Sequence, residues 1–67
     1  MKTVKRKPHW PKWANYKATD YVGEIWFYRN EPYMLATRWD ESHETRFYKT
    51  KKNYKGDWTK SLRKIED

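Results

Sequence analysis

The sequence predicts a small α+β domain, in which a three-stranded antiparallel β-meander is followed by a short C-terminal helix and preceded by a basic N-terminal arm. Three observations support this fold. Trp, Tyr and Phe make up thirteen of the 67 residues, and these side chains favour strands. Short polar or proline-containing breaks divide the aromatic stretches from one another. The last apolar residues of the chain recur at helical spacing.

Three strands are expected in the centre of the chain, at residues 21–29, 33–39 and 44–51. Asn30 and Glu31, followed by Pro32, break the first strand from the second. The polar residues 40–43 separate the second strand from the third. Because both connections are short, neighbouring strands should pair in antiparallel orientation.

This meander would carry apolar side chains on both faces. With a two-residue turn at Asn30 and Glu31, Phe27 faces Met34 on one side. The opposite face then includes Trp26, Tyr28 and Trp39. A sheet with one wet face would alternate apolar and polar residues, so this sheet needs two covers. The C-terminal helix can cover one face, and the other is either covered by residues 10–16 or left as an exposed aromatic patch that would mark a binding surface.

The C-terminal helix is expected to begin at Asp57, a natural N-cap that follows Gly56. Its apolar stripe consists of Trp58, Leu62 and Ile65, which are spaced i, i+4 and i+7. A helix of about ten residues does not hold in isolation, so we expect it to pack on the sheet.

Residues 1–9 show no apolar periodicity and are expected to form a flexible basic arm, which leaves residues 10–67 as a single small domain. Residues 11–18 can form a short helix, because Pro11 suits the first helical position. An extended segment that lies across the domain is the alternative for the same residues.

The composition excludes several classes of protein. The chain has no cysteine, so neither a disulfide nor a thiolate metal site can stabilise it. Its longest apolar run, residues 25–28, is far shorter than the roughly 20 residues of a membrane span. No constellation of a nucleophile, a base and an orienting group is recognisable. We therefore expect a cytoplasmic protein that is not an enzyme and has no catalytic residues, metal site, cofactor or membrane partner.

Positive charge is concentrated toward both ends of the chain. The 16 Lys and Arg residues exceed the nine acids and give a net charge of +7. Residues 1–20 carry a net charge of +5 and residues 46–65 carry +7, whereas residues 21–45 carry −3. This distribution predicts a polyanion or an acidic protein as the partner.

A nucleic acid, either DNA or RNA, is the first expected partner, and a DNA-binding protein would be associated with the nucleoid. Cations alternate with rings over residues 46–55, so that cations can neutralise phosphates while rings stack on bases. The same lysines also suit a solvated edge strand that resists aggregation. With the N-terminal arm included, the predicted nucleic-acid-binding residues are Lys5, Arg6, Lys7, Arg46, Tyr48, Lys49, Lys51, Lys52, Tyr54 and Lys55.

The order of three strands and a helix, with Lys49, Lys51 and Lys52 on the third strand, resembles AP2-type and phage-integrase arm-binding domains. Those domains insert their sheet into the major groove, and the resemblance is one of layout that implies no role for single residues. The alternative function is a small inhibitor or adaptor module, of the kind that phages encode, which binds an acidic host protein through an aromatic face. Its expected anchors are Trp10, Trp13 and Trp39.

Overall fold

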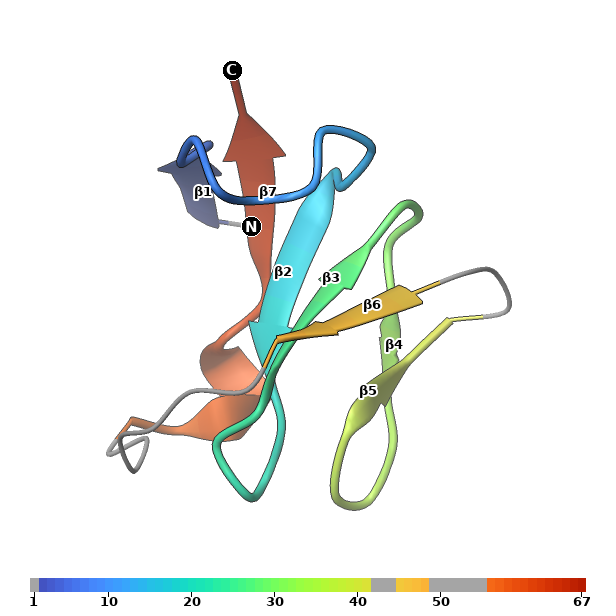
Figure 1. Cartoon of the computed structure of the whole chain (residues 1–67). Coiled ribbons are helices and arrows are strands. Elements are labelled where there is room, and N and C mark those ends of the chain that lie inside the picture. Colours follow the sequence, from blue (N-terminus) through green and yellow to red (C-terminus); the bar gives the residue numbers. More distant parts are fainter. Residues whose placement is uncertain (1, 42–44, 49–55) are drawn as a thin grey trace.

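The computed structural model describes residues 2–41, 45–48 and 56–67 and consists mainly of β-structure (Figure 1). Its main sheet has five strands in the order β1 (Lys2–Lys5), β7 (Arg63–Glu66), β2 (Tyr16–Thr19), β3 (Ile25–Tyr28) and β6 (Thr45–Tyr48). A separate hairpin is formed by β4 (Tyr33–Met34) and β5 (Trp39–Asp40), and one 3-10 turn, η1, spans Trp58–Lys60. All strand pairs are antiparallel except β1 with β7. No helix in this part of the chain has the length and apolarity needed to cross a bilayer.

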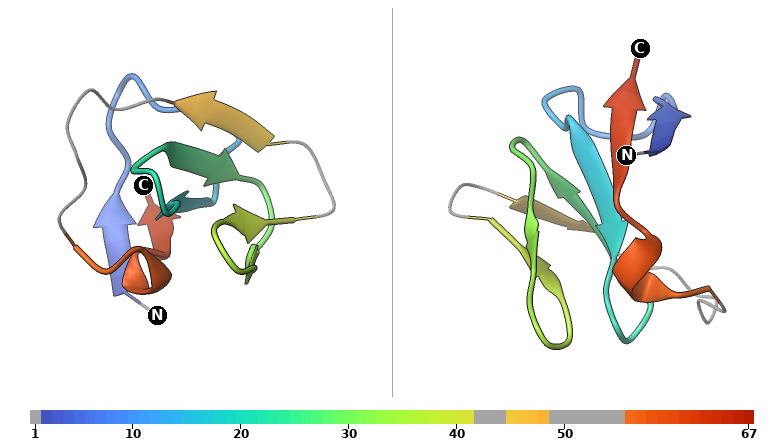
Figure 2. Two further views of the ribbon diagram at one scale, coloured as in Figure 1. Left: turned by 90° about the horizontal axis from the view of Figure 1, so that it is seen from below. Right: turned by 180° about the vertical axis from the view of Figure 1, so that it is seen from behind.

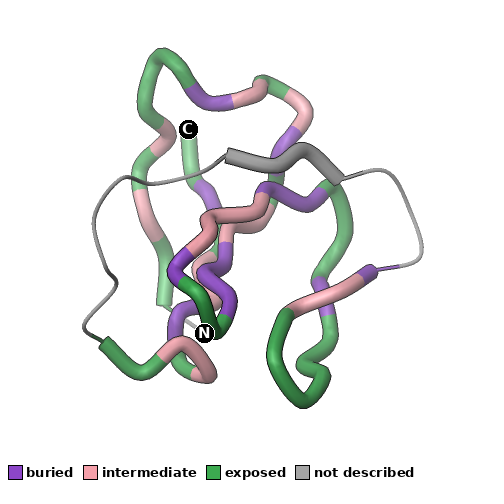
Figure 3. The backbone as a smooth tube through the Cα atoms, turned by 60° about the horizontal axis from the view of Figure 1, so that its bottom comes forward, coloured by how far each residue is buried: buried purple, intermediate pink, exposed green. Residues whose placement is uncertain are grey.

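Strand β3 is central to the fold, because two consecutive residues at its end are buried. Figure 3 shows where the buried residues lie along the chain. Phe27 is 2% exposed and Tyr28 is 1% exposed, although consecutive residues of a strand point to opposite sides. On the side of Phe27, Trp10 lies 5.5 Å away between ring centroids, and Ala14 and Ile65 complete the buried cluster. On the other side, the Tyr28 hydroxyl donates to the Trp39 carbonyl at 3.1 Å.

These two covers come from different segments (Figure 2). Strands β1 and β7 lie on one side of β3 and the β4–β5 hairpin lies on the other. The segment that contains Trp10 and Ala14 therefore covers one face, as one of the two sequence-based alternatives proposes. The second cover is the hairpin and not a C-terminal helix.

Asp20 builds the turn that joins β2 to β3. Its Oδ1 accepts hydrogen bonds from the backbone N–H of Val22 at 3.1 Å and of Glu24 at 2.9 Å. Its Oδ2 accepts from the Trp26 indole at 3.2 Å. Gly23 takes a φ of 89°, which glycine adopts without steric cost. Both oxygens of the buried Asp20 carboxylate thus accept hydrogen bonds, and these bonds fix the turn and the position of the Trp26 ring.

The predicted meander is only partly correct, because β3 does not pair with the segment that follows it. Its partners are β2 and β6, so Phe27 lies opposite Lys17 and Arg46 rather than Met34. A two-residue hairpin turn needs positive φ, which Asn-Gly adopts readily and Glu31 does not. Among the described residues only Gly23 has a positive φ. The chain therefore leaves the sheet after β3 and folds back on itself as the β4–β5 hairpin.

The predicted second strand, residues 33–39, is split by a turn at its middle. The backbone N–H of Leu35 donates to the Arg38 carbonyl at 2.7 Å, and Tyr33 then pairs with Asp40. The apolar character of this stretch comes from a hairpin that packs over the sheet rather than from a continuous sheet strand.

The predicted C-terminal helix is wrong, and the structure has η1 followed by β7. Asp57 does cap this segment, since its carboxylate accepts from the Thr59 backbone N–H at 3.0 Å, and the Thr59 hydrogen bonds lower the pKa of Asp57. Buried Ser61 then accepts from the Thr19 backbone N–H at 2.8 Å, which directs the chain along β2. Pairing with both β1 and β2 outweighs the helical preference of a short isolated segment. Ile65 is buried, as expected, but from a strand.

Residues 2–5, which belong to the segment expected to form a basic arm, form strand β1. Val4 lies opposite Ile65 and packs against the buried cluster. Arg6, next in the chain, donates to the carbonyl oxygens of Pro11 at 2.5 Å and Ala14 at 2.8 Å. Its Nε also pairs with the Asp67 carboxylate. Residues 1–9 carry too few apolar side chains to predict a strand from the local sequence. The strand that pairs with β1 is β7, at the far end of the chain, and no local pattern indicates this pairing.

The structure predicts that Arg6 stabilises the fold. Arg6→Met should lower the free energy of unfolding by about 1–3 kcal/mol, because two part-buried carbonyl groups lose a charged donor. Lys5→Met, an exposed neighbour on β1, removes the same charge and should change the stability much less. Urea unfolding of both variants measures the difference. Equal midpoints for the two variants would show that Arg6 does not tie the N-terminal segment to the domain.

Candidate nucleic-acid interface and aromatic pocket

The fold divides the charges of the chain between two regions. Residues 2–17 and 58–67, which build β1, β7, β2 and their connections, carry nine cations against two carboxylates, Glu66 and Asp67. Residues 20–41, which build β3 and the β4–β5 hairpin, carry two arginines against five carboxylates. Among the residues that the structure describes, the side with β1 and β7 is therefore basic, and the side with the hairpin is acidic.

The parallel pairing of β1 with β7 brings together cations from the two ends of the chain. Lys2 lies opposite Arg63, and Arg63 lies opposite Lys17 on the next strand. We use the name basic edge for the exposed lysines of β1, of β7 and of the segment between β1 and β2, which are Lys2, Lys5, Lys7, Lys12 and Lys64. A hollow of about 320 Å³ opens at this edge, lined by Arg6, Lys7, Pro8, Trp10, Lys12 and Asp67.

The environment of Lys17 indicates that the electrostatic potential of this region is positive. Its ammonium group lies 5.6 Å from the centroid of the Trp10 ring. Burial lowers the pKa of Lys17, and the neighbouring charges of Arg63 and Lys7 lower it further. Like charges at this site are thus not neutralised within the protein, which favours an external anion.

The predicted nucleic-acid-binding residues have different fates in the structure. Lys5 and Lys7 lie exposed on the basic edge, whereas Arg6 turns inward to backbone carbonyl groups. Arg46 and Tyr48 belong to β6, the opposite edge strand of the five-stranded sheet from β1. Five of the predicted residues, Lys49, Lys51, Lys52, Tyr54 and Lys55, lie outside the described residues.

The anchors of the alternative function do not form an exposed face. Trp10 is buried in the core, and Trp13 and Trp39 are half-buried. Trp13 lies beneath the Arg29 guanidinium, 5.7 Å from ring centroid to Cζ.

Exposed apolar side chains gather instead at two turns. They are Tyr21 and Val22, between β2 and β3, and Tyr33, Met34 and Leu35 in the β4–β5 hairpin. The Tyr21 backbone N–H donates to the Thr37 carbonyl at 3.1 Å, which joins the two turns. Sequence reasoning placed these residues inside strands and therefore missed this surface.

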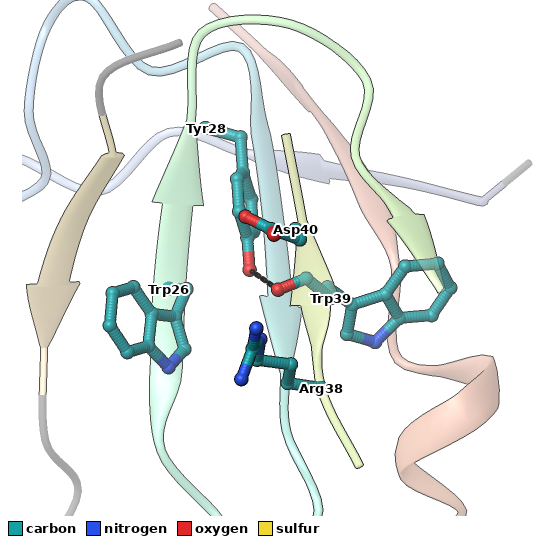
Figure 4. A pocket seen from close by; sticks show the side chains of 5 residues that line it. All are labelled: Trp26, Tyr28, Arg38, Trp39 and Asp40. Carbon is teal, nitrogen blue, oxygen red and sulfur yellow. Dashed lines mark hydrogen bonds between the residues drawn. The ribbon is translucent and has the colours of Figure 1, made fainter. Parts of the chain in front are cut away.

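An aromatic pocket lies between β3 and the β4–β5 hairpin (Figure 4). It has a volume of about 300 Å³ and is lined by Trp26, Tyr28, Arg38, Trp39 and Asp40. Trp26 and Tyr28 project from β3, while the other three residues come from β5 and the turn before it. In Figure 4, Trp26 and Trp39 lie on either side of Tyr28, and the Arg38 guanidinium points into the space between them.

The aromatic donors around this pocket bind to other parts of the protein. The indole N–H of Trp26 donates to Asp20, and that of Trp39 donates to the Trp58 carbonyl at 3.2 Å. The Tyr28 hydroxyl donates to the Trp39 carbonyl. These hydrogen bonds hold the three rings in place.

The electrostatic environment of Tyr28 is negative. Burial raises the pKa of its hydroxyl, and the charges of Asp40, Asp20 and Glu41 raise it further, against a smaller opposing effect of Arg38. Glu41 is itself 8% exposed. Its Oε2 accepts from the Asn30 backbone N–H at 2.8 Å, whereas its buried Oε1 has no hydrogen-bond partner among the described residues.

Comparison with known proteins does not add to this picture. No protein-family model matches the chain, and no match was found among curated proteins or solved structures.

The raised pKa of Tyr28 predicts a loss of stability at high pH. Tyrosine in the unfolded chain ionises near pH 10, whereas folded Tyr28 stays protonated at higher pH. The folded state then holds the extra proton, so its stability falls as the pH rises above about 10. Tyr28→Phe removes this contribution, and the stability advantage of the wild type over Tyr28→Phe should shrink between pH 8 and pH 11.

Urea unfolding at several pH values measures this difference directly. Tyr33→Phe is the matched control, because Tyr33 is exposed and its substitution should leave the pH dependence of the wild type unchanged. The same alkaline loss in wild type and Tyr28→Phe would contradict the assignment.

Proposed function

We propose that this chain is a small nucleic-acid-binding protein that contacts phosphates through the basic edge. The observation that carries the proposal is the β1–β7 pairing, which gathers lysines from both ends of the chain at one side of the domain. The only carboxylates in these segments are Glu66 and Asp67, and Asp67 pairs with Arg6. An excess of unpaired lysines on one surface is the expected footprint of a polyanion partner.

The hollow at the basic edge supports the same proposal. Lys7 and Lys12 lie on its rim from segments that flank the buried Trp10. Two ammonium groups over a concave surface suit the backbone of a nucleic acid, in which phosphates recur at regular intervals. Tyr16 lies opposite Lys64 in the β2–β7 pair, and its half-buried ring is suited to stacking on a base near Lys64.

A protein-binding module is the second candidate, and the surface at the two turns supports it. Val22 is 72% exposed and Met34 is 52% exposed, and neighbouring exposed apolar side chains often mark an interface. This surface differs from the aromatic anchors expected from the sequence. This surface lies on the acidic part of the domain, which would repel an acidic partner. A partner there would therefore be bound mainly through apolar contacts.

The phosphate-binding proposal predicts a specific loss in a charge variant. Lys7→Gln with Lys12→Gln should weaken binding to single- and double-stranded DNA and RNA of any sequence, because phosphate contacts carry no sequence information. For double-stranded DNA, the slope of log affinity against log salt should fall by about two. Fluorescence anisotropy with labelled oligonucleotides at several salt concentrations measures both quantities.

The matched control is Arg29→Gln with Arg38→Gln, which removes the two arginines of residues 20–41, away from the basic edge. Equal losses in both double variants would show that only the net charge matters. Binding that is unchanged in Lys7→Gln with Lys12→Gln would refute the basic edge as the site. If the wild type binds no nucleic acid at low salt but retains a protein partner that is lost in Val22→Ser, the second candidate is correct.

A further inference from the structure

The hollow at the basic edge already binds one anionic group of the protein itself. The Nε–H group of Arg6 donates to Asp67 Oδ1, and both residues line the hollow together with Lys7 and Lys12. Within the described part of the chain, Asp67 is the only carboxylate that pairs with Arg6, and no carboxylate pairs with either lysine. Three cations therefore line a hollow that holds a single carboxylate.

The Arg6 guanidinium is held in place independently of Asp67. Its Nη1 donates to the Pro11 carbonyl at 2.5 Å, and its Nη2 donates to the Ala14 carbonyl at 2.8 Å. These carbonyl groups orient the guanidinium but carry no net charge, so an anion at Nε is still needed to neutralise it. If the Asp67 carboxylate left, Arg6 would keep its orientation and offer Nε as a preformed donor.

Asp67 is the exposed partner of this ion pair. Its side chain is 83% exposed, whereas that of Arg6 is 17% exposed. The two strands hold the pair together through the backbone, because the Arg6 N–H donates to the Glu66 carbonyl at 2.8 Å. An ion pair with one solvated partner contributes little to stability, since the carboxylate is well hydrated when it is free. An external anion can thus replace the carboxylate while the strand pairing stays intact.

We propose that a phosphate group binds in this hollow by displacing the Asp67 carboxylate from Arg6, with Lys7 and Lys12 as its further partners. Phosphate and carboxylate oxygens are both accepted by a guanidinium, and a phosphate has additional oxygens for the two ammonium groups. In its identification of the natural ligand as a nucleic-acid backbone, this inference rests on the proposed function. It adds that Arg6 contacts the ligand and that Asp67 competes with it.

Inorganic phosphate tests the exchange directly. In ¹⁵N-labelled protein, phosphate should shift the Nε–H signal of Arg6, with sodium chloride at equal ionic strength as the blank. The signal should differ between wild type and Asp67→Asn in the absence of phosphate, because only the wild type has a carboxylate at Nε. At saturating phosphate the two signals should converge, since the same anion then occupies the same position in both proteins.

Glu66→Gln is the matched control for Asp67→Asn. Each variant removes one carboxylate from an exposed position, so the net charges are equal, but only Asp67 lines the hollow. Asp67→Asn should bind inorganic phosphate about 1.5-fold to fivefold more tightly than Glu66→Gln, which corresponds to the loss of a competing exposed ion pair of about 0.2–1 kcal/mol. A short labelled oligonucleotide should show the same order of affinities. The amide spectrum of each variant shows that it is folded.

Three results would overturn the exchange. Equal phosphate affinities of Asp67→Asn and Glu66→Gln would show that Asp67 acts only through the net charge. An Arg6 signal that does not move with phosphate would exclude Arg6 as a contact. Signals of wild type and Asp67→Asn that still differ at saturation would show that phosphate binds without displacing the carboxylate.

Failure of this inference is distinguishable from failure of the proposed function. If oligonucleotides bind and lose affinity in Lys7→Gln with Lys12→Gln, while phosphate leaves the Arg6 signal unmoved, only the exchange is refuted. If inorganic phosphate displaces Asp67 but no oligonucleotide binds at low salt, the exchange is correct and the nucleic-acid function is wrong.

Discussion

The burial of two consecutive residues, Phe27 and Tyr28, is the constraint on which the rest of the structure depends. Because they point to opposite faces of β3 and both are almost fully buried, the chain must cover both faces of a very short sheet. A domain of 67 residues has little apolar surface to divide between two covers. The N-terminal segment with Trp10 therefore supplies one cover, and the β4–β5 hairpin supplies the other.

These two covers differ in how completely they fill the space over the sheet. On the Phe27 side, Trp10, Ala14 and Ile65 form a closed cluster that β1 and the Arg6 hydrogen bonds tie to the sheet. On the Tyr28 side, the hairpin contributes two-residue strands and contacts β3 partly through polar bonds. The space between the hairpin and β3 is the aromatic pocket, so the pocket results from covering a sheet face with a minimal element.

Local signals in the sequence predicted the strand character of the centre, the Asp57 cap and the apolar character of both faces, with Trp26 and Tyr28 on one of them. Trp39 was expected on the same face but lies on the separate β4–β5 hairpin. The local signals failed where a distant partner decides the conformation. Residues 2–5 form the strand β1 because they pair with β7. The segment of β7 is a strand and not a helix because β1 and β2 pair with it. The sheet also has β3 between β2 and β6 instead of the predicted meander. The reason is that the sequence between β3 and β4 lacks a residue suited to a tight hairpin turn.

The same covering elements also separate the basic and the acidic region of the domain. The cover on the Phe27 side belongs to the lysine-rich segments, and the hairpin carries most of the carboxylates near Tyr28. The molecule measures 27 × 25 × 21 Å, which exceeds the Debye length of about 8 Å at physiological ionic strength. Solvent ions therefore screen the two regions from each other, and each one acts on its ligand through its nearest charges. A chain with a net charge of +7 can in this way have both a basic and an acidic region on one small domain, because the charge that matters to a ligand is local.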